Sequence, residues 1–220
     1  RGHDAHGHVD VGTYREAVAL LSPDPEGQYF LYRFSDPTFL LAQAVLRALG
    51  SHRRLGRRAL DLCGGSGHLT RVLASFTPPG ETVLADVFFW KLWLARRFTA
   101  PGCEAICCDA NNPLPFARDV FSIAVCSDAF PYIWHKRLCA EEMMRSVVPD
   151  GAVVMSHLHS ALGENVSAGM TLTPEAYRDL FAPMAPRLFD DNTLLNQVLD
   201  RNALDLSMST PANTFGSEVA

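Results

Sequence analysis

Short apolar runs alternate with longer segments of helical spacing from about residue 58 onward. Five runs are apolar on both faces and are predicted as strands, at 58–63, 82–87, 103–109, 120–127 and 152–157. Three segments between them carry the helical pattern, at 69–76, 88–98 and 135–148. Strands that alternate with helices and are apolar on both faces are typical of a parallel sheet covered on both sides. The pattern therefore predicts an α/β fold with a doubly wound, mostly parallel sheet.

The segments that flank this alternating region have a different pattern. Tyr14 to Leu21 is predicted as a short helix, residues 21–28 as a loop, and residues 29–34 form an aromatic run. Asp36 and Pro37 have the chemistry of an N-cap and a first helical position, and Gly50 ends that helix. These features predict a helical N-terminal lid over residues 1–50.

The last third of the chain is the hardest to assign. A helix is predicted from Thr173-Pro174, a strand at 185–189 and a short helix at 192–202. The small-residue loop 160–170 is expected to lie over the site. The domain prediction is a lid at 1–50, a ligand-binding core at 51–207, and a polar tail at 208–220 that could lead to a further segment.

Composition narrows the class of protein. The chain has 220 residues, 48% of them hydrophobic, and a net charge of −5. The negative charge argues against binding to a nucleic-acid backbone. No apolar run approaches the ~20 residues that span a bilayer. Six cysteines without a CxxC pair predict reduced thiols in the cytoplasm. The chain starts at Arg1, and we interpret the histidines of residues 1–10 as a frayed end rather than a metal site.

The stretch "ALDLCGGSGHLT" at 59–70 places three glycines shortly after Asp61. A phosphate loop needs a lysine after the glycines, and His68 stands there. A dinucleotide fingerprint needs a third glycine where Thr70 stands, and Asp61 would face a pyrophosphate. A cationic ligand fits better, and S-adenosylmethionine carries a sulfonium, an amino group and no phosphate.

This stretch resembles the first motif of the class I S-adenosylmethionine-dependent methyltransferases, with Cys63 where a glycine is usual. The resemblance continues to about His157. It implies that Asp86 takes the ribose hydroxyls, that Asp109 meets the adenine amino group, and that Asp61 serves the methionine end. The full set that it implies for the cofactor is Tyr14, Asp61, Cys63, Gly64, Gly65, Gly67, Asp86, Val87, Asp109, Ala110 and Ser127.

Methyl transfer from a sulfonium releases a neutral thioether, so the reaction needs no general acid. A base matters only if the acceptor must lose a proton. The candidates at the carboxyl ends of the strands are Asp128, His157 and His159, and we favour His157 because it lies nearer the rigid strand. The two histidines would share a face only if the strand continued through Leu158; otherwise the loop decides.

The lid brings aromatic residues that could exclude water and shape an apolar acceptor pocket, at Tyr14, Tyr29, Tyr32 and Phe34; ordinary packing is expected for at least two of them. The leading hypothesis is a methyltransferase that acts on a small molecule, at oxygen, without nucleic-acid or membrane partners. A homodimer or a flanking domain stays open. The alternatives are a non-catalytic cofactor-binding domain, which the departures at Cys63 and Ser122 favour, and a nicotinamide-dependent oxidoreductase.

Overall fold

The computed structural model describes residues 11–50, 57–163, 169–201, 204–207 and 209–211. The expectations for the histidine-rich first ten residues, for the middle of the loop 160–170 and for most of the polar tail lie outside these described residues. No helix in the described part of the chain is long and apolar enough to cross a membrane.

The described residues contain one five-stranded sheet in the order β3-β2-β1-β4-β5. The strands are β1 (Ala59–Leu62), β2 (Thr82–Asp86), β3 (Glu104–Cys107), β4 (Phe121–Ser127) and β5 (Val147–Ser156). All neighbouring strands are parallel, so their carboxyl ends lie along one edge of the sheet. The order reverses between β1 and β4, and such a switch point opens a ligand crevice beyond the strand ends.

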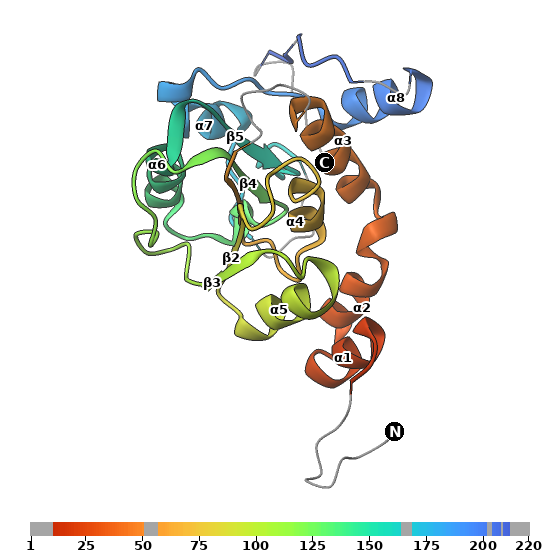
Figure 1. Ribbon diagram of the computed structural model, residues 1–220. Helices are drawn as coiled ribbons and strands as arrows, with labels where there is room; N and C mark the ends of the chain where they lie inside the picture. The colour runs from red at the N-terminus through yellow and green to blue at the C-terminus, as the bar shows by residue number, and fades with distance from the viewer. Residues whose placement is uncertain (1–10, 51–56, 164–168, 202–203, 208, 212–220) are drawn as a thin grey trace, which may run out of the picture.

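Helices cover both faces of the sheet (Figure 1). On one face α3 (Pro37–Gly50), α4 (His68–Leu73) and α5 (Phe89–Leu94) pack on Ala59 and Leu84. On the other face α6 (Lys136–Ser146) and α7 (Pro174–Leu180) pack on Leu60 and Leu62. Because side chains alternate along β1, its residues contribute to two separate apolar cores, one on each face of the sheet. The doubly wound α/β prediction is confirmed.

The N-terminal segment forms α1 (Tyr14–Leu21), α2 (Pro25–Tyr32) and the 3-10 turn Arg33–Ser35 before α3. Thr13 and Glu16 build a capping box at the start of α1. The loop prediction for 21–28 is wrong in its second half, because Asp24 caps α2 and Pro25 is its first residue. This is the Asp-Pro signal that also starts α3, so the sequence did contain the evidence for α2.

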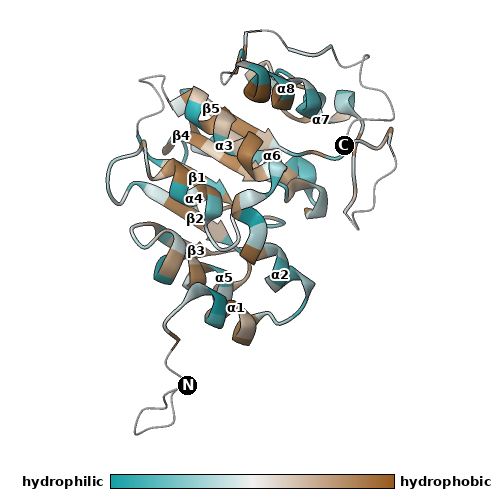
Figure 2. Ribbon diagram, turned by 90° about the vertical axis from the view of Figure 1, so that its right-hand side faces the viewer, coloured by the Kyte–Doolittle hydropathy of each residue, from teal (hydrophilic) through white to brown (hydrophobic). Residues whose placement is uncertain are grey.

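The C-terminal end differs more from the prediction. Residues 185–189 form no strand, while Thr173 caps α7 and α8 spans Asp191–Arg201, close to the predicted helices. Strand β5 begins at Val147, earlier than predicted, and pairs with β4 through a register irregularity between Phe121 and Ile123. Figure 2 shows the strands in order, with α8 beyond β5 and α5 at the β3 end. In the described residues β5 is an edge strand.

Candidate active site

The glycine loop after β1 is held by Asp86 at the end of β2. The Oδ2 atom of Asp86 accepts the Gly65 N–H at 3.0 Å, and its Oδ1 atom accepts the Phe88 N–H at 2.9 Å. Gly65 has φ +57°. This left-handed conformation costs glycine little. The Asp86 carboxylate therefore joins two adjacent strand ends and still has lone pairs for further donors.

Gly67 packs closely against a neighbouring turn. A Cβ there would lie 2.8 Å from the Ala95 Cβ and 3.1 Å from the Thr99 Oγ1, in the π-helical turn Ala95–Thr99 that follows α5. Thr99 donates a hydrogen bond to the Ser66 carbonyl of the same loop. The contact fixes the glycine loop against the turn, and Gly67 is not part of the lining of the cleft described below.

Asp61 is a buried carboxylate within β1, 1% exposed. Its Oδ2 accepts the Thr70 hydroxyl at 2.6 Å, whereas its Oδ1 is buried and has no hydrogen-bond partner among the described residues. Burial raises the pKa of Asp61 to about 7, against the lowering effect of the Thr70 hydrogen bond. An unpartnered buried oxygen at the mouth of the glycine loop is favourable for a cationic ligand.

A cleft of about 630 Å³ lies beyond the carboxyl ends of the strands. Nine of the residues predicted to bind the cofactor line it: Asp61, Cys63, Gly64, Gly65, Asp86, Val87, Asp109, Ala110 and Ser127. Asp109 also accepts hydrogen bonds from the Asn111 N–H at 2.8 Å and the Asn111 side chain at 2.9 Å. The sheet edge thus brings together side chains from four loops, as the parallel topology requires.

The predicted lid residues divide between the cleft and the packing behind it. Tyr29 lines the cleft, whereas Tyr14, Tyr32 and Phe34 do not. The Tyr14 hydroxyl lies 2.7 Å from the Ser66 Oγ, so α1 is fastened to the glycine loop. Phe34 packs on the His68 ring, with 4.4 Å between ring centroids.

His68 connects the lid to the glycine loop. Its Nε2 lies 3.1 Å from the Phe30 carbonyl in α2, and its Nδ1 lies 3.3 Å from the Ser66 Oγ. Burial lowers the pKa of His68 to about 4, so the ring is neutral and its Nε2–H donates to Phe30. An ion pair between Lys91 and Glu26, at 2.5 Å, adds a second link from α2 to the core.

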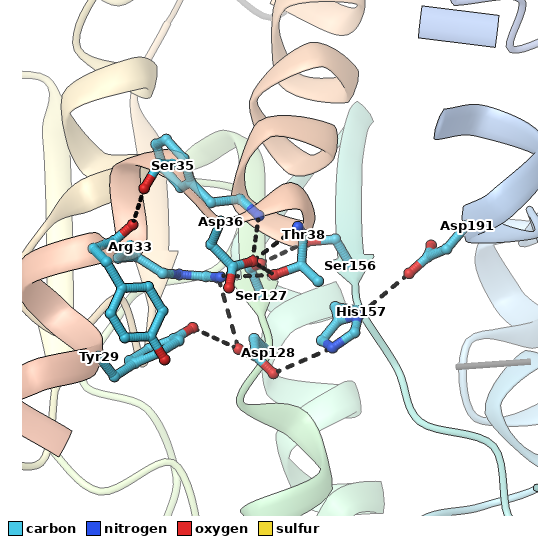
Figure 3. Close-up of polar contacts among 12 residues, drawn as sticks. Tyr29, Arg33, Ser35, Asp36, Thr38, Ser127, Asp128, Ser156, His157 and Asp191 are labelled. Atoms are coloured by element: carbon cyan, nitrogen blue, oxygen red, sulfur yellow. Dashed lines mark hydrogen bonds and ion pairs between the residues drawn. The ribbon is translucent and has the colours of Figure 1, made fainter. Parts of the chain in front are cut away.

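Asp128 stands where β4 ends and contacts the lid (Figure 3). The Tyr29 hydroxyl donates to the Asp128 Oδ2 at 2.8 Å, and an Arg33 guanidinium nitrogen lies 3.7 Å from the same oxygen. Arg33 also donates to Thr38 at 2.7 Å and pairs with Asp36 at 3.2 Å. The arginine is 6% exposed, so its charge is held between two carboxylates at the connection from α2 to α3.

His157 stands where β5 ends, opposite Asp128 (Figure 3). Its Nδ1 lies 3.3 Å from the Asp191 Oδ2, and its Nε2 lies 3.9 Å from the Asp128 Oδ1. Asp191 is the first residue of α8. His159 packs edge-on against the His157 ring, with 4.6 Å between centroids. The three predicted catalytic residues therefore come together, although β5 stops at Ser156 and the loop sets the orientation.

Backbone strain marks the same two strand ends. Asp128 has φ +54° and His157 has φ +55°. This left-handed conformation is uncommon for residues with a Cβ. Such strain costs roughly 1–3 kcal/mol and persists where the surroundings fix it, often at functional sites. Asp119 and Ala185 have the same conformation, so it turns the chain at both strand ends but does not by itself mark a functional residue.

The electrostatics set the two histidines apart. Burial lowers the pKa of His157, but the Asp191 hydrogen bond and the charges of Asp128 and Asp191 outweigh it, so the pKa lies above the usual histidine value. Burial and the neighbouring His157 lower the pKa of His159. The nearby Arg33 opposes the protonation of His157 only weakly. His157 is thus the histidine with a carboxylate to orient it.

Sequence reasoning missed three groups of this site: Arg33, Lys91 and Asp191. Asp191 immediately precedes the helix predicted at 192–202, but nothing in the sequence shows that this helix reaches β5. Arg33 lies within the aromatic run 29–34, where a single charge among apolar residues was an available signal.

The strand order and the residues at the strand ends are those of a Rossmann-like domain, a fold in which a nucleotide-type cofactor binds at the switch point. The residues present fit S-adenosylmethionine in particular. Asp61 has a buried oxygen that accepts no hydrogen bond from the described residues, which favours a positively charged ligand group. Gly65 has no side chain, so the space that a Cβ would occupy there, 3.4 Å from the Phe30 ring, stays open. Asp86 has acceptor capacity for ribose hydroxyls.

Comparison with known proteins supports this class. A family model of the methyltransferase domain matches residues 59–151. The ubiquinone/menaquinone biosynthesis C-methyltransferase UbiE of Ectopseudomonas mendocina is 30% identical over 145 residues, which cover 63% of this chain and 55% of that protein. The UbiE protein of Ralstonia pickettii is 27% identical over 189 residues, which cover 76% of this chain and 72% of that protein.

A solved structure of a SAM-dependent methyltransferase from Aquifex aeolicus has the same fold. It matches with a TM-score of 0.57 at 14% identity and covers 76% of this chain and 92% of that chain. Residues 59–151 therefore match a methyltransferase domain, and the described residues share the fold of the solved methyltransferase. The chain spans only 55% of the length of the first relative described above.

Proposed function

We propose that the protein transfers a methyl group from S-adenosylmethionine to a hydroxyl oxygen of a small molecule. One observation carries the choice of acceptor. His157 is held by Asp191 at 3.3 Å on one nitrogen, and its other nitrogen lies 3.9 Å from Asp128, which lines the cofactor cleft. A carboxylate that holds one imidazole nitrogen leaves the other as an oriented base.

When bound, S-adenosylmethionine supplies an electrophilic methyl group on a sulfonium and leaves as a neutral thioether. In our proposal Asp86 holds the ribose, Asp109 and Ala110 hold the adenine, and Asp61 faces the cationic methionine end. His157 takes the hydroxyl proton on Nε2 as the acceptor oxygen forms its bond to the methyl carbon. Tyr29 and Arg33 hold the Asp128 carboxylate in place. In the proposal their side chains also help to exclude water from the space between Asp128 and the lid.

Carbon is the second candidate acceptor atom, because the UbiE relatives are C-methyltransferases by name. Deprotonation of a phenol gives an anion whose charge is shared by oxygen and ring carbon. The same base therefore serves both outcomes, and the structure of the product separates them. A non-catalytic cofactor-binding domain predicts no product at all.

Two measurements test the proposal. Calorimetry should show binding of S-adenosylmethionine and of S-adenosylhomocysteine and much weaker binding of NAD; a preference for NAD would refute the cofactor assignment. Activity is then followed with isotope-labelled methyl groups over a panel of phenols and other hydroxylated molecules, and the product is identified by mass spectrometry and NMR. A methyl ether supports the oxygen acceptor.

The role of the base is tested by a matched pair of variants. His157→Gln should lower turnover by about 10²–10⁴-fold, the usual contribution of a general base, while S-adenosylhomocysteine affinity stays within about twofold. His159→Gln should cost less than about tenfold, because no carboxylate of the described residues hydrogen-bonds that ring. Full activity of the double variant would show that positioning alone drives the reaction or that Asp128 is the base.

A further inference from the structure

Two imidazoles and a carboxylate meet where β4 and β5 end. Asp128, His157 and His159 each offer one ligand atom, and the three atoms lie within 4.8 Å of one another. The His157 Nε2 lies 3.9 Å from the Asp128 Oδ1. Ligand atoms on a tetrahedral zinc ion lie about 3.4 Å apart, because each bond to the ion is about 2.1 Å long. Small rotations of the three side chains therefore bring them to coordination distance.

His157 is held in the way that metal-bound histidines are held. Its Nδ1 lies 3.3 Å from the Asp191 Oδ2, and its Nε2 points toward Asp128 (Figure 3). A histidine that binds a metal almost always donates its other ring N–H to a carboxylate or a carbonyl, which fixes the tautomer and the ring orientation. Asp191 thus leaves the lone pair on Nε2. The same contact orients a general base, so these two residues alone do not distinguish the two roles.

The Asp128 carboxylate is oriented from its lid side. Its Oδ2 accepts the Tyr29 hydroxyl at 2.8 Å, and an Arg33 nitrogen lies 3.7 Å from the same oxygen. Its Oδ1 is the oxygen that lies toward His157. Carboxylates that bind metals are themselves hydrogen-bonded by neighbouring groups. Asp128 and His157 therefore each have an outer contact that directs one atom toward the space between them.

His159 is the residue to which the proposed transfer gives no role. Its ring packs edge-on against the His157 ring, with 4.6 Å between centroids, and it is half-buried. The Tyr177 hydroxyl donates to the His159 carbonyl at 3.2 Å, which fastens this part of the loop. A general base needs one oriented imidazole, whereas a metal ion needs several converging ligands. Two imidazoles and one carboxylate form the ligand set of zinc sites that keep a fourth position open.

The charges around the cluster favour a cation, and the ligand atoms select its class. Asp128 and Asp191 lie on either side of His157. Arg33 shares its positive charge between Asp128 and Asp36, which lies 3.2 Å from it. The carboxylates therefore outnumber the guanidinium. Imidazole nitrogen suits zinc and other first-row transition metals, whereas Mg²⁺ and Ca²⁺ prefer oxygen ligands.

We infer that Asp128, His157 and His159 bind a divalent transition metal ion of the zinc class, with Asp191 as the positioning residue for His157. Asp128 lines the cofactor cleft, so the ion lies at the wall of that cleft. A metal ion on Nε2 takes the lone pair that the proposed function assigns to the acceptor proton. The metal-bound form and the base form of His157 therefore exclude each other, and only this consequence rests on the proposed function.

Binding of Zn²⁺ to the full chain tests the inference without any need for turnover. The first ten residues contain three histidines, so the background protein carries His3→Gln, His6→Gln and His8→Gln. In calorimetry it should bind a single Zn²⁺ ion per chain, and Mg²⁺ at least about tenfold more weakly. Equal binding of the two ions would overturn the transition-metal class, and absence of saturable Zn²⁺ binding would overturn the site.

X-ray absorption spectroscopy of the Zn²⁺-loaded background protein identifies the ligands. The spectrum should show imidazole nitrogen and oxygen around the ion, without sulfur. Sulfur in the coordination shell would show that cysteines hold the ion and would overturn the assignment to Asp128, His157 and His159. This measurement needs no replacement within the cluster, so it does not depend on the folding of any variant of these residues.

Single replacements in the same background locate the ion. His159→Gln should weaken Zn²⁺ binding by about 100-fold or more because it removes a ligand, and Asp191→Asn by about tenfold because it removes only the charge that orients His157. His135→Gln is the matched control, since His135 is exposed and outside the cluster, and it should leave the affinity within about twofold. Equal effects of His159→Gln and His135→Gln would overturn the site, and an unchanged affinity of Asp191→Asn would overturn the role of Asp191.

Thermal unfolding monitored by circular dichroism serves as the control for folding, and each variant should unfold cooperatively. If His159→Gln does not, Asp128→Asn takes its place with the same expected loss of Zn²⁺ affinity. None of these measurements involves S-adenosylmethionine. Failure of Zn²⁺ binding therefore refutes the metal site and leaves the proposed function standing, whereas failure of methyl transfer refutes the proposed function and leaves the Zn²⁺ results to judge the metal site.

Discussion

Replacement of Asp86 tests the proposed cofactor site most directly. The carboxylate is 5% exposed and accepts two backbone N–H groups, from Gly65 and Phe88. We expect it to accept the ribose hydroxyls of the cofactor with its remaining lone pairs. A hydrogen bond to a charged group contributes about 1.5–3 kcal/mol, so Asp86→Ala should weaken S-adenosylhomocysteine binding by roughly 10- to 150-fold.

The structure adds a complication to this prediction. Because Asp86 also holds the Gly65 N–H, its removal loosens the glycine loop, and affinity falls even if the ribose never contacts the carboxylate. Asp86→Asn is the milder variant, since the amide oxygen can still accept one of the two N–H groups. Thermal unfolding monitored by circular dichroism should show that Asp86→Asn folds and has lost some stability.

A pair of ligands separates the direct contact from the loop effect. Adenosine and 2′,3′-dideoxyadenosine differ only in the ribose hydroxyls. The wild-type protein should prefer adenosine by about tenfold or more, and this preference should collapse in Asp86→Asn, because the hydrogen bonds that produce it require the carboxylate. If the variant keeps the preference of the wild type, Asp86 acts on the loop alone and the ribose assignment is wrong.

Three further predictions concern stability and pH. Gly67 and Gly80 have nearly equal φ angles, +83° and +81°, but only at Gly67 does a Cβ meet packed atoms. Gly67→Ala should therefore lower the free energy of unfolding in urea by about 1 kcal/mol or more beyond Gly80→Ala, and equal losses would refute the packing argument. Because the folded pKa of Asp61 is about 7, above its unfolded value of ~3.9, the native state binds more protons between these pH values, and unfolding free energy should fall as pH rises through that window. Asp61→Asn should flatten this slope, and an unchanged slope would exclude Asp61 as its source. In a plot of methylation rate against pH, Asp191→Asn should shift the fall in rate on the acid side to lower pH, because the variant lacks the carboxylate that raises the pKa of His157. An unchanged position of this fall would show that a group other than His157 causes it.

The sequence alone determined the local elements of the core. Buried strands such as "TVLADV" are recognisable by apolar residues on both faces, and the Asp36-Pro37 pair indicates the start of α3. The order of strands and helices then fixes a parallel sheet, because parallel neighbours need a crossover between them. From this follows the edge where strand-end residues such as Asp86 gather, so most of the proposed cofactor residues could be placed in advance.

The edges of the fold were decided by tertiary contacts. Residues 185–189 have an apolar pattern that predicts a strand, but they line a hollow beside β5 without pairing to that strand. Gly67 looks like the other loop glycines in the sequence, yet its role is set by the turn after α5. Propensity is local, and these outcomes depend on a neighbour that propensity does not specify.

The pair of His157 and Asp191 shows most clearly where prediction from the sequence ends. The two residues are far apart in the chain, and nothing in either local sequence points to the other. They meet because β5 ends at Ser156, a left-handed residue turns the chain, and α8 begins beside the sheet edge. Sequence patterns report which side chains share a face of one element. The distance between the ends of two separate elements depends on how the whole chain packs, and that distance is what makes a carboxylate and an imidazole a functional pair.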